Sequence, residues 1–117
     1  MQKQFEKLRE YLDMSEDLPF AEFTKYNTEV LNELQANYHT YDLDTLMKTI
    51  AVITVVAANA IDRGKSAVNH TEKKKYKKVA DKMTFWAEAV ARRLEREHNM
   101  TKEQVDAEID KLLADVG

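Results

Sequence analysis

Glycine and proline are scarce in this chain, and their scarcity restricts the fold more than any other feature. The 117 residues include two Gly and one Pro, whereas these two residue types together make up roughly 12% of an average protein. Sandwiches, barrels and Rossmann units need more of them for their tight turns. Glycine-rich phosphate loops are excluded for the same reason. The sequence therefore predicts an all-α fold, and its length predicts a single domain, 1–117.

Apolar residues recur at three- and four-residue spacing over five segments, which is typical of amphipathic helices. The predicted helices cover 2–14, 18–39, 43–63, 72–98 and 102–115. The links between them are short, and short links favour antiparallel neighbours. We therefore predict an antiparallel bundle of four to five helices.

The segment 43–63 carries apolar residues on every face, which predicts a central helix that is buried all round. Its β-branched residues are numerous enough for a strand at 49–56, which remains the alternative. A helix is preferred because the segment is long and ends at Arg63-Gly64, with glycine in a common helix-terminating position. The uncharged run 49–61, between Lys48 and Asp62, is shorter than the about 20 residues that cross a bilayer. We therefore predict no transmembrane segment.

Side chains that stabilise helix ends occur near the predicted boundaries. A capping box joins a Thr or Ser to a Glu or Gln three residues later. The candidates are Asp17 before Pro19, Asp42 or Asp44, Asn99 as a C-cap, and Thr101 with Gln104 as a capping box.

Charge is distributed unevenly along the chain. Residues 63–96 carry 11 basic and 4 acidic groups, residues 1–62 carry 5 and 11, and residues 97–117 carry 2 and 6. Many of the lysines stand at the start of a predicted helix, where the helix dipole disfavours cations. They form either a solvated face or a site for nucleic acid, an acidic partner or anionic lipid. The residues predicted for such a site are Lys73, Lys74, Lys75, Lys77, Lys78, Lys82, Arg92 and Arg93.

Three aromatic residues, Tyr26, Tyr41 and Phe85, lie off the main apolar stripes. Aromatic rings in such positions need a second surface to cover them. We therefore expect an interface there, with a homo-oligomer (a dimer) or a protein partner. Asn27 and Asn59 fall on apolar faces, either as buried residues that fix helix pairing or as edge residues.

Catalytic and metal-binding patterns are sparse. The chain has no Cys, which excludes disulfides, thiolate metal sites and cysteine nucleophiles. Glu95 and His98 have the Glu-x-x-His spacing of di-iron bundles, but those proteins need that motif twice. The sequence therefore predicts no metal site and no cofactor.

The segment Arg93-Leu94-Glu95-Arg96-Glu97-His98 resembles the motif of the HEPN family, an Arg followed by a His after four to six residues. Members of this family are small helical bundles, and many are dimeric, metal-independent ribonucleases. The resemblance implies that Arg93 orients a phosphate and that His98 acts as general acid or base. Arg63 and His70 have a compatible spacing as well.

These observations favour a small cytosolic helical bundle, without catalytic activity, that acts by self-association and protein binding. The N-terminal sequence shows no apolar signal region, which is the basis for the cytosolic expectation. Two alternatives remain open. One is a HEPN-like ribonuclease that uses Arg93 and His98, and the other is a nucleic-acid-binding regulator that uses the basic stretch Lys73–Lys82.

Overall fold

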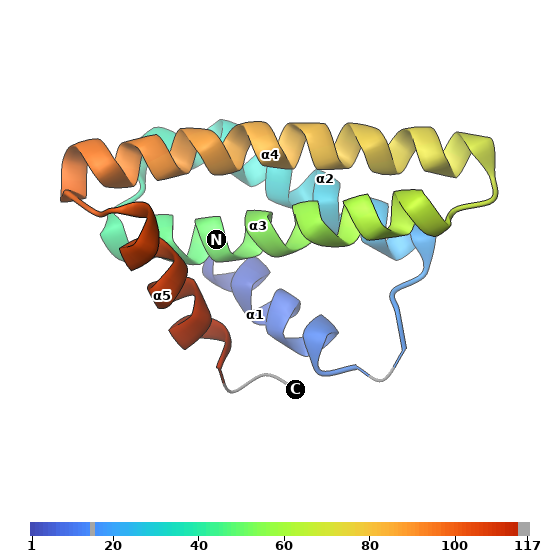
Figure 1. Ribbon diagram of the computed structural model, residues 1–117, viewed down its shortest axis with the longest axis horizontal. Helices are drawn as coiled ribbons and strands as arrows, with labels where there is room; N and C mark the ends of the chain where they lie inside the picture. Colours follow the sequence, from blue (N-terminus) through green and yellow to red (C-terminus); the bar gives the residue numbers. More distant parts are fainter. Residues whose placement is uncertain (15, 115–117) are drawn as a thin grey trace.

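The computed structural model describes residues 1–14 and 16–114, and within them it contains five α-helices and no strand. The all-α prediction is therefore confirmed (Figure 1). The helices are α1 (Gln2–Leu12), α2 (Phe20–Asn37), α3 (Leu43–Ser66), α4 (His70–His98) and α5 (Lys102–Leu113), with a 3-10 turn, η1 (Tyr38–Thr40), between α2 and α3.

Helices α3 and α4 form a long antiparallel hairpin that organises the bundle (Figure 1). Helix α2 runs behind this pair, and the shorter α1 and α5 cross α3 on the side away from α4. The fully buried side chains come from the three long helices, and Leu34, Leu46, Ile53 and Met83 are among them. Helix α3 is therefore central, as predicted from its apolar composition.

Burial of α3 is complete only in its middle. Residues 49–53 are all buried, whereas Leu43 and Asp44 near the start, and Ala58, Asn59 and Ile61 near the end, are exposed. The prediction of a helix buried all round is thus wrong for both ends, because the other helices cover α3 on all sides only in its middle.

The β-branched segment 49–56 is helical throughout, so the strand alternative is wrong. Val52, Ile53 and Val56 are at most 2% exposed, and burial of such side chains outweighs their small loss of helix propensity. The hydroxyl of Thr49 donates to the carbonyl of Thr45 at 2.7 Å. That bond satisfies a polar group that is itself completely buried.

By length and composition alone, α3 is long and apolar enough to cross a membrane. The helix has 24 residues because it continues through Lys48 and Asp62, the two charges that bracket the apolar run. In the bundle, 56% of its most apolar window is buried. Core helices of soluble proteins pass the same test, so the absence of a transmembrane segment stays a prediction.

Three of the expected helix caps are present. Asp42 caps α3 by accepting a hydrogen bond from the Thr45 amide at 2.9 Å. Asn99 ends α4 in the left-handed region, with φ of 52°, as expected for Asn at such a position. Thr101 and Gln104 form the capping box of α5, with both reciprocal hydrogen bonds.

Several predicted boundaries are wrong. Helix α1 ends at Leu12, and α2 begins after Pro19 without a side-chain cap from Asp17. Residues 38–40, the first two of which were predicted to end α2, form the separate turn η1. Helix α4 begins at His70 because the side chain of Asn69 accepts hydrogen bonds from the next amides, at 2.9 and 3.1 Å. Helix α5 ends at Leu113, and residue 115 lies outside the described residues.

Gly64 lies inside α3, not at its end, because the helix continues to Ser66. A methyl group at position 64 would lie 3.5 Å from Cβ of Tyr76 in α4, an ordinary van der Waals distance. Glycine costs a helix interior about 0.5 to 1 kcal/mol relative to alanine. We therefore expect Gly64→Ala to raise the free energy of unfolding by about that amount. Urea unfolding followed by circular dichroism measures it, and a lowered midpoint would contradict this geometry.

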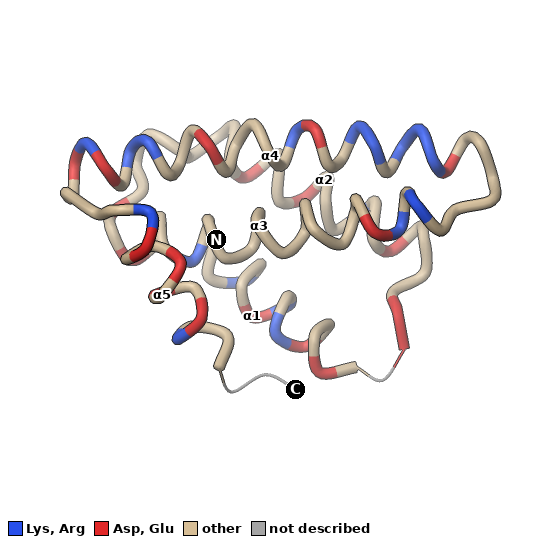
Figure 2. The backbone as a smooth tube through the Cα atoms, in the orientation of Figure 1, with Lys and Arg blue, Asp and Glu red and all other residues tan. Residues whose placement is uncertain are grey.

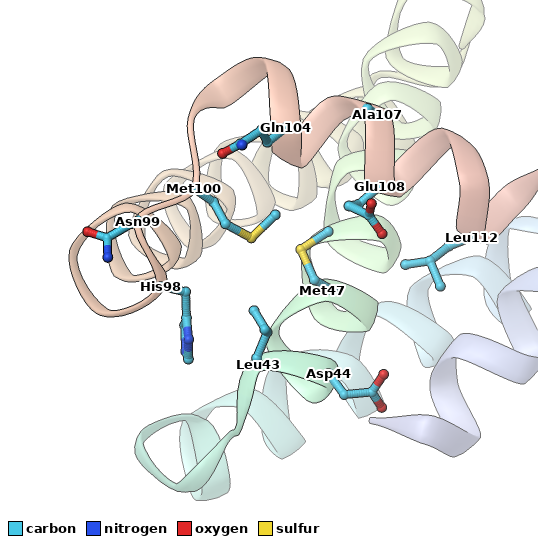
Figure 3. Close-up of a pocket in the computed structure, with 10 residues that line it drawn as sticks. All are labelled: Leu43, Asp44, Met47, His98, Asn99, Met100, Gln104, Ala107, Glu108 and Leu112. Atoms are coloured by element: carbon cyan, nitrogen blue, oxygen red, sulfur yellow. The ribbon is translucent and has the colours of Figure 1, made fainter.

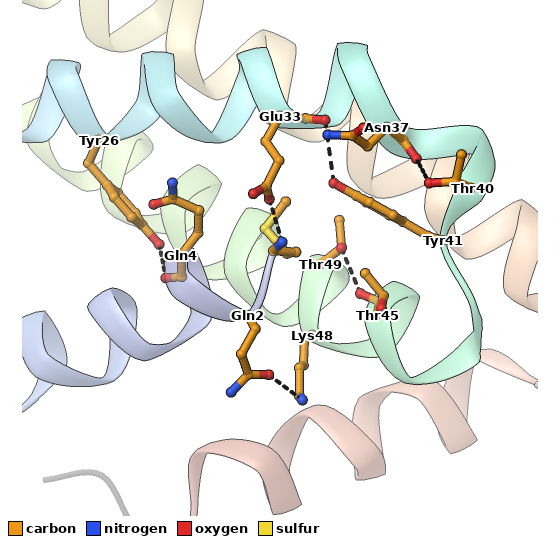
Figure 4. A network of polar contacts seen from close by, with 11 residues as sticks. Gln2, Gln4, Tyr26, Glu33, Asn37, Thr40, Tyr41, Thr45, Lys48 and Thr49 are labelled. Atoms are coloured by element: carbon orange, nitrogen blue, oxygen red, sulfur yellow. Dashed lines mark hydrogen bonds and ion pairs between the residues drawn. The ribbon is translucent and has the colours of Figure 1, made fainter.

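Polar contacts join α1 to α2 beside the core (Figure 4). The hydroxyl of Tyr26 donates to the Gln4 carbonyl at 2.6 Å. The carboxylate of Glu33 pairs with the amino group of Met1 at 2.7 Å, and its backbone carbonyl accepts from the Tyr41 hydroxyl at 3.4 Å. Both tyrosine hydroxyls are therefore used within the chain.

Burial and the nearby negative charge of Glu33 raise the pKa of Tyr41 to about 12, and burial raises the pKa of Tyr26 well above its usual range. An unfolded tyrosine has a pKa near 10, so the stabilisation from these rings is complete below pH about 10 and is lost as the pH rises toward about 12. We expect the absorbance difference near 295 nm between the parent and Tyr41→Phe to titrate near pH 12. A midpoint near 10 would contradict the burial of this hydroxyl.

Candidate interaction surface

Helix α4 lies at one edge of the bundle, and Lys and Arg positions recur along it (Figure 2). We call the exposed side of this helix its outer face. Positions 78, 82, 85, 89, 92 and 96 are three or four residues apart, so they follow one another along one side of the helix. We call four of the exposed cations on this side the basic stripe: Lys78, Lys82, Arg92 and Arg96. Within the described residues, none of the four makes an ion pair or a side-chain hydrogen bond. Two exposed acids, Asp81 and Glu88, lie beside the stripe.

Phe85 lies in the middle of the basic stripe and is 60% exposed. Its ring packs edge-on against Trp86, with centroids 5.9 Å apart, and Trp86 packs in the same way against Tyr38 at 5.2 Å. The hydroxyl of Tyr38 donates to the Ala89 carbonyl on α4 at 3.1 Å. The exposed ring is thus supported by a row of aromatic side chains that leads back into the bundle.

Arg93, which was predicted to belong to the cationic site, has a structural role instead. Its guanidinium donates to the carbonyls of Tyr38 and Tyr41, the latter at 2.7 Å, and to the Glu97 carboxylate at 2.6 Å. It also stacks 5.1 Å from the centre of the Tyr38 ring. Because these groups occupy its donors and only 16% of the side chain is exposed, Arg93 holds η1 onto α4 and is not part of the exposed face.

The other predicted cations outside the stripe have three environments. Lys75 lies 5.7 Å from the centre of the Phe20 ring. Lys77 pairs with Asp81 at 3.1 Å. Lys73 and Lys74 are exposed near the start of α4 and line a groove that α4 forms with the end of α3.

Two of the three aromatic residues that were predicted to form an interface are core residues. Tyr26 is 3% exposed and Tyr41 is 8% exposed. Their position off the main stripes has a different cause: α1 covers Tyr26, which packs edge-on against Tyr11 at 5.2 Å, and the chain after η1 turns Tyr41 back toward α2. The expectation that they need a second molecule to cover them is therefore wrong, and Phe85 alone fits it.

The two asparagines on apolar faces have different environments. Asn27 is 7% exposed, and its side-chain oxygen has no hydrogen-bond partner among the described residues. Asn59 is exposed near the end of α3. Of the two alternatives given by the sequence, Asn27 is therefore a buried polar residue and Asn59 is an edge residue.

Pairing of the basic stripe with its own copy would be only partly favourable. In an antiparallel pair of α4 helices centred on Phe85, Lys78 of one copy would face Arg92 of the other, whereas Lys82 would face Glu88. In a parallel pair, each cation would lie beside its equivalent. Like charges that face each other across an interface are unfavourable, so an acidic partner suits the stripe better than a parallel copy does.

His98, the histidine of the HEPN-like motif, lines a groove of about 600 Å³ between α3 and α5 (Figure 3). The groove walls are mostly apolar, and Met47, Met100 and Leu112 contribute to them. Arg93 is engaged with η1 as described, so the structure does not show it prepared to orient a phosphate. Within the described residues, no group of three His, Asp or Glu side chains is placed to hold a metal ion.

Two members of the candidate surface were not among the predicted site residues. Arg96 extends the cationic line by one turn, and Ala89, a small and half-buried residue, lies one turn beyond Phe85. Both residues lie at three- or four-residue steps from Phe85, so they share its side of the helix. This spacing could identify them only once Phe85 was known to be exposed.

The chain matches no protein-family model, no curated protein and no solved structure in the comparisons made. The similarity to the HEPN family therefore rests on its six-residue motif.

Proposed function

We propose that this protein is a non-catalytic binding protein whose outer α4 face docks an acidic protein partner. The observation that carries the proposal is Phe85, an exposed ring on a helix side with four cations that have no partner among the described residues. Lys82 is the nearest of these cations along the helix, and the exposed acids Asp81 and Glu88 also flank the ring. Buried aromatic anchors surrounded by polar residues supply most of the binding energy at protein interfaces. Arginines at the rim add specificity and faster association.

Nucleic acid is the second candidate for this surface, since the same cations could neutralise phosphates. The observation that favours it is the exposed aromatic ring beside cations, because bases stack on such rings. An acidic protein fits better because the stripe carries one ring, whereas single-stranded nucleic acids stack successive bases on several. We also propose that the protein self-associates through other surfaces. Light scattering after gel filtration tests this by measuring the molar mass in solution.

The partner can be captured with a photoreactive phenylalanine analogue at position 85, applied in extract of the source cells. Trp86 then serves as the probe of affinity, because it is the only tryptophan of the chain and contacts Phe85. We expect Phe85→Ala to weaken binding of the captured acidic protein roughly 30-fold, as for an interface hot spot. Arg92→Met should weaken it and reduce its salt dependence.

Lys25→Met, on α2, is the matched control for Arg92→Met, since it also removes one exposed cation. We expect it to bind as the parent does. Capture that disappears after nuclease treatment would favour the nucleic-acid alternative. Equal affinity of the parent and Phe85→Ala would exclude the outer α4 face as the docking site.

A further inference from the structure

The turn between α3 and α4 forms one end of the molecule, and lysine positions lie on both sides of it (Figure 1, Figure 2). Exposed apolar and cationic side chains occur together there. Val68, in the turn, is fully exposed at 101%. Ile61, at the end of α3, is 46% exposed. Isolated apolar residues on a surface are common, so these two gain significance only from the charges around them.

A groove of about 530 Å³ lies beside this turn, between the end of α3 and the start of α4. Its floor includes Ala60, Ile61 and Ala80. Its rim is cationic and consists of Lys65, Lys73, Lys74 and Lys77, together with His70. The groove also contains Asp81, which pairs with Lys77. We call Val68, Ile61 and the three remaining lysines, Lys65, Lys73 and Lys74, the hairpin tip.

The cations of the hairpin tip have no structural partner. Within the described residues, Lys65, Lys73 and Lys74 make no ion pair and no side-chain hydrogen bond. Lys73 and Lys74 are the fourth and fifth residues of α4, so the helix dipole, which acts mainly on the first turn, gives neither of them a favourable contact. Stability of the helix therefore does not account for them, whereas an anionic surface at this end would favour both the lysines and the positive end of the dipole.

We propose that the hairpin tip docks on an anionic lipid surface, with Lys65, Lys73 and Lys74 near the phosphate groups and Val68 inserted among the lipid chains. Juxtamembrane lysines attract anionic lipids, and this attraction is short-ranged and sensitive to salt. An exposed aliphatic side chain strengthens membrane binding further, because its apolar surface is buried among the lipid chains. The proposal is independent of the basic stripe, because it uses other residues at one end of the molecule.

The apolar character of the tip distinguishes a lipid surface from the other anionic ligands. The turn has no aromatic ring on which a nucleic-acid base could stack. A fully exposed aliphatic residue at the end of a protruding hairpin has nothing on its own chain to cover it, and a bilayer covers such a residue without a matching pocket.

The test is flotation of the full chain with vesicles of phosphatidylcholine alone or with about 30% phosphatidylserine, at low and high salt. We expect the partition coefficient at low salt to be roughly 100-fold higher on the anionic vesicles than on the neutral ones, and most of this difference to be lost at high salt. Lys73→Gln with Lys74→Gln should lower the partition coefficient about 30-fold, as follows from the usual contribution of a lysine near an anionic membrane. Val68→Asp should lower it by at least tenfold, but part of that loss comes from its added negative charge. Val68→Ser, which adds no charge, should lower it about tenfold through lost insertion, and Val68→Leu should retain it.

The matched control is Lys25→Gln with Lys102→Gln, which removes two exposed cations of α2 and α5. We expect its partition to remain within about threefold of the parent. Thermal unfolding by circular dichroism checks that every variant folds, which is expected because all the substituted residues are exposed or lie at the exposed turn.

Three outcomes would overturn the proposal. The first is equal binding to neutral and anionic vesicles. The second is equal loss in the tip variants and in the matched control, which would show attraction by net charge only. The third is unchanged binding of Val68→Ser, which would show attraction of headgroups without insertion.

Discussion

The Arg93→Met variant is expected to unfold with a free energy about 3 kcal/mol below that of the parent, because it leaves two inward-facing carbonyls without their donor. The guanidinium bonds the carbonyls of Tyr38 and Tyr41 and the Glu97 carboxylate, and it stacks on the Tyr38 ring. These contacts hold η1, and with it the connection from α2 to α3, against α4. Urea unfolding followed by circular dichroism measures the change.

Arg92 provides a matched control one residue away. It is exposed on the basic stripe and has no ion pair among the described residues. Arg92→Met should therefore change the free energy of unfolding by no more than about 0.5 kcal/mol. The two variants are predicted to differ: Arg93→Met loses stability, whereas Arg92→Met loses partner binding. Equal stability of the two variants would contradict the structural role of Arg93.

The Ile53→Ala variant is expected to lose about 3 to 4 kcal/mol of unfolding free energy. Ile53 is completely buried in the middle of α3, where the removed atoms leave a cavity that the surrounding helices can close only in part. Differential scanning calorimetry should show a melting temperature lower by roughly 10 to 20 °C for a domain of this size.

The control for Ile53→Ala is Thr54→Ala, at the next position, whose side chain is exposed. Its melting temperature should stay within a few degrees of that of the parent. This pair also tests the position of α3 in the bundle. If α3 left the bundle to cross a membrane, Ile53 and Thr54 would both lie among lipids, and Ile53→Ala would create no cavity between helices.

Periodicity alone predicted the existence of all five helices in the described residues. Spacing of apolar residues at three and four positions is a local property, and it identified the segments of α2, α4 and α5 within a few residues. Three caps, at Asp42, Asn99 and Thr101, were also visible in the sequence, because capping needs one side chain next to the helix end.

The candidate site could be predicted only in part. The cationic stretch Lys73–Lys82 and the exposed ring of Phe85 were identified from their positions in the sequence. The sequence did not reveal that Arg93 points toward η1 whereas Arg92 points to solvent, because that depends on which turn lies beside α4. Tyr26 and Tyr41 were assigned to an interface for the same reason: the covering elements are distant in the sequence.

The sequence by itself determined the all-α class, the order of the helices and the cationic character of α4, because periodicity and charge are properties of neighbouring residues. The tertiary structure decided which cations are exposed, which aromatic rings are covered and how far α3 is buried. Those properties arise where segments distant in the chain pack together: η1 against α4 for Arg93, α1 against α2 for Tyr26, and the helices around α3 for its burial.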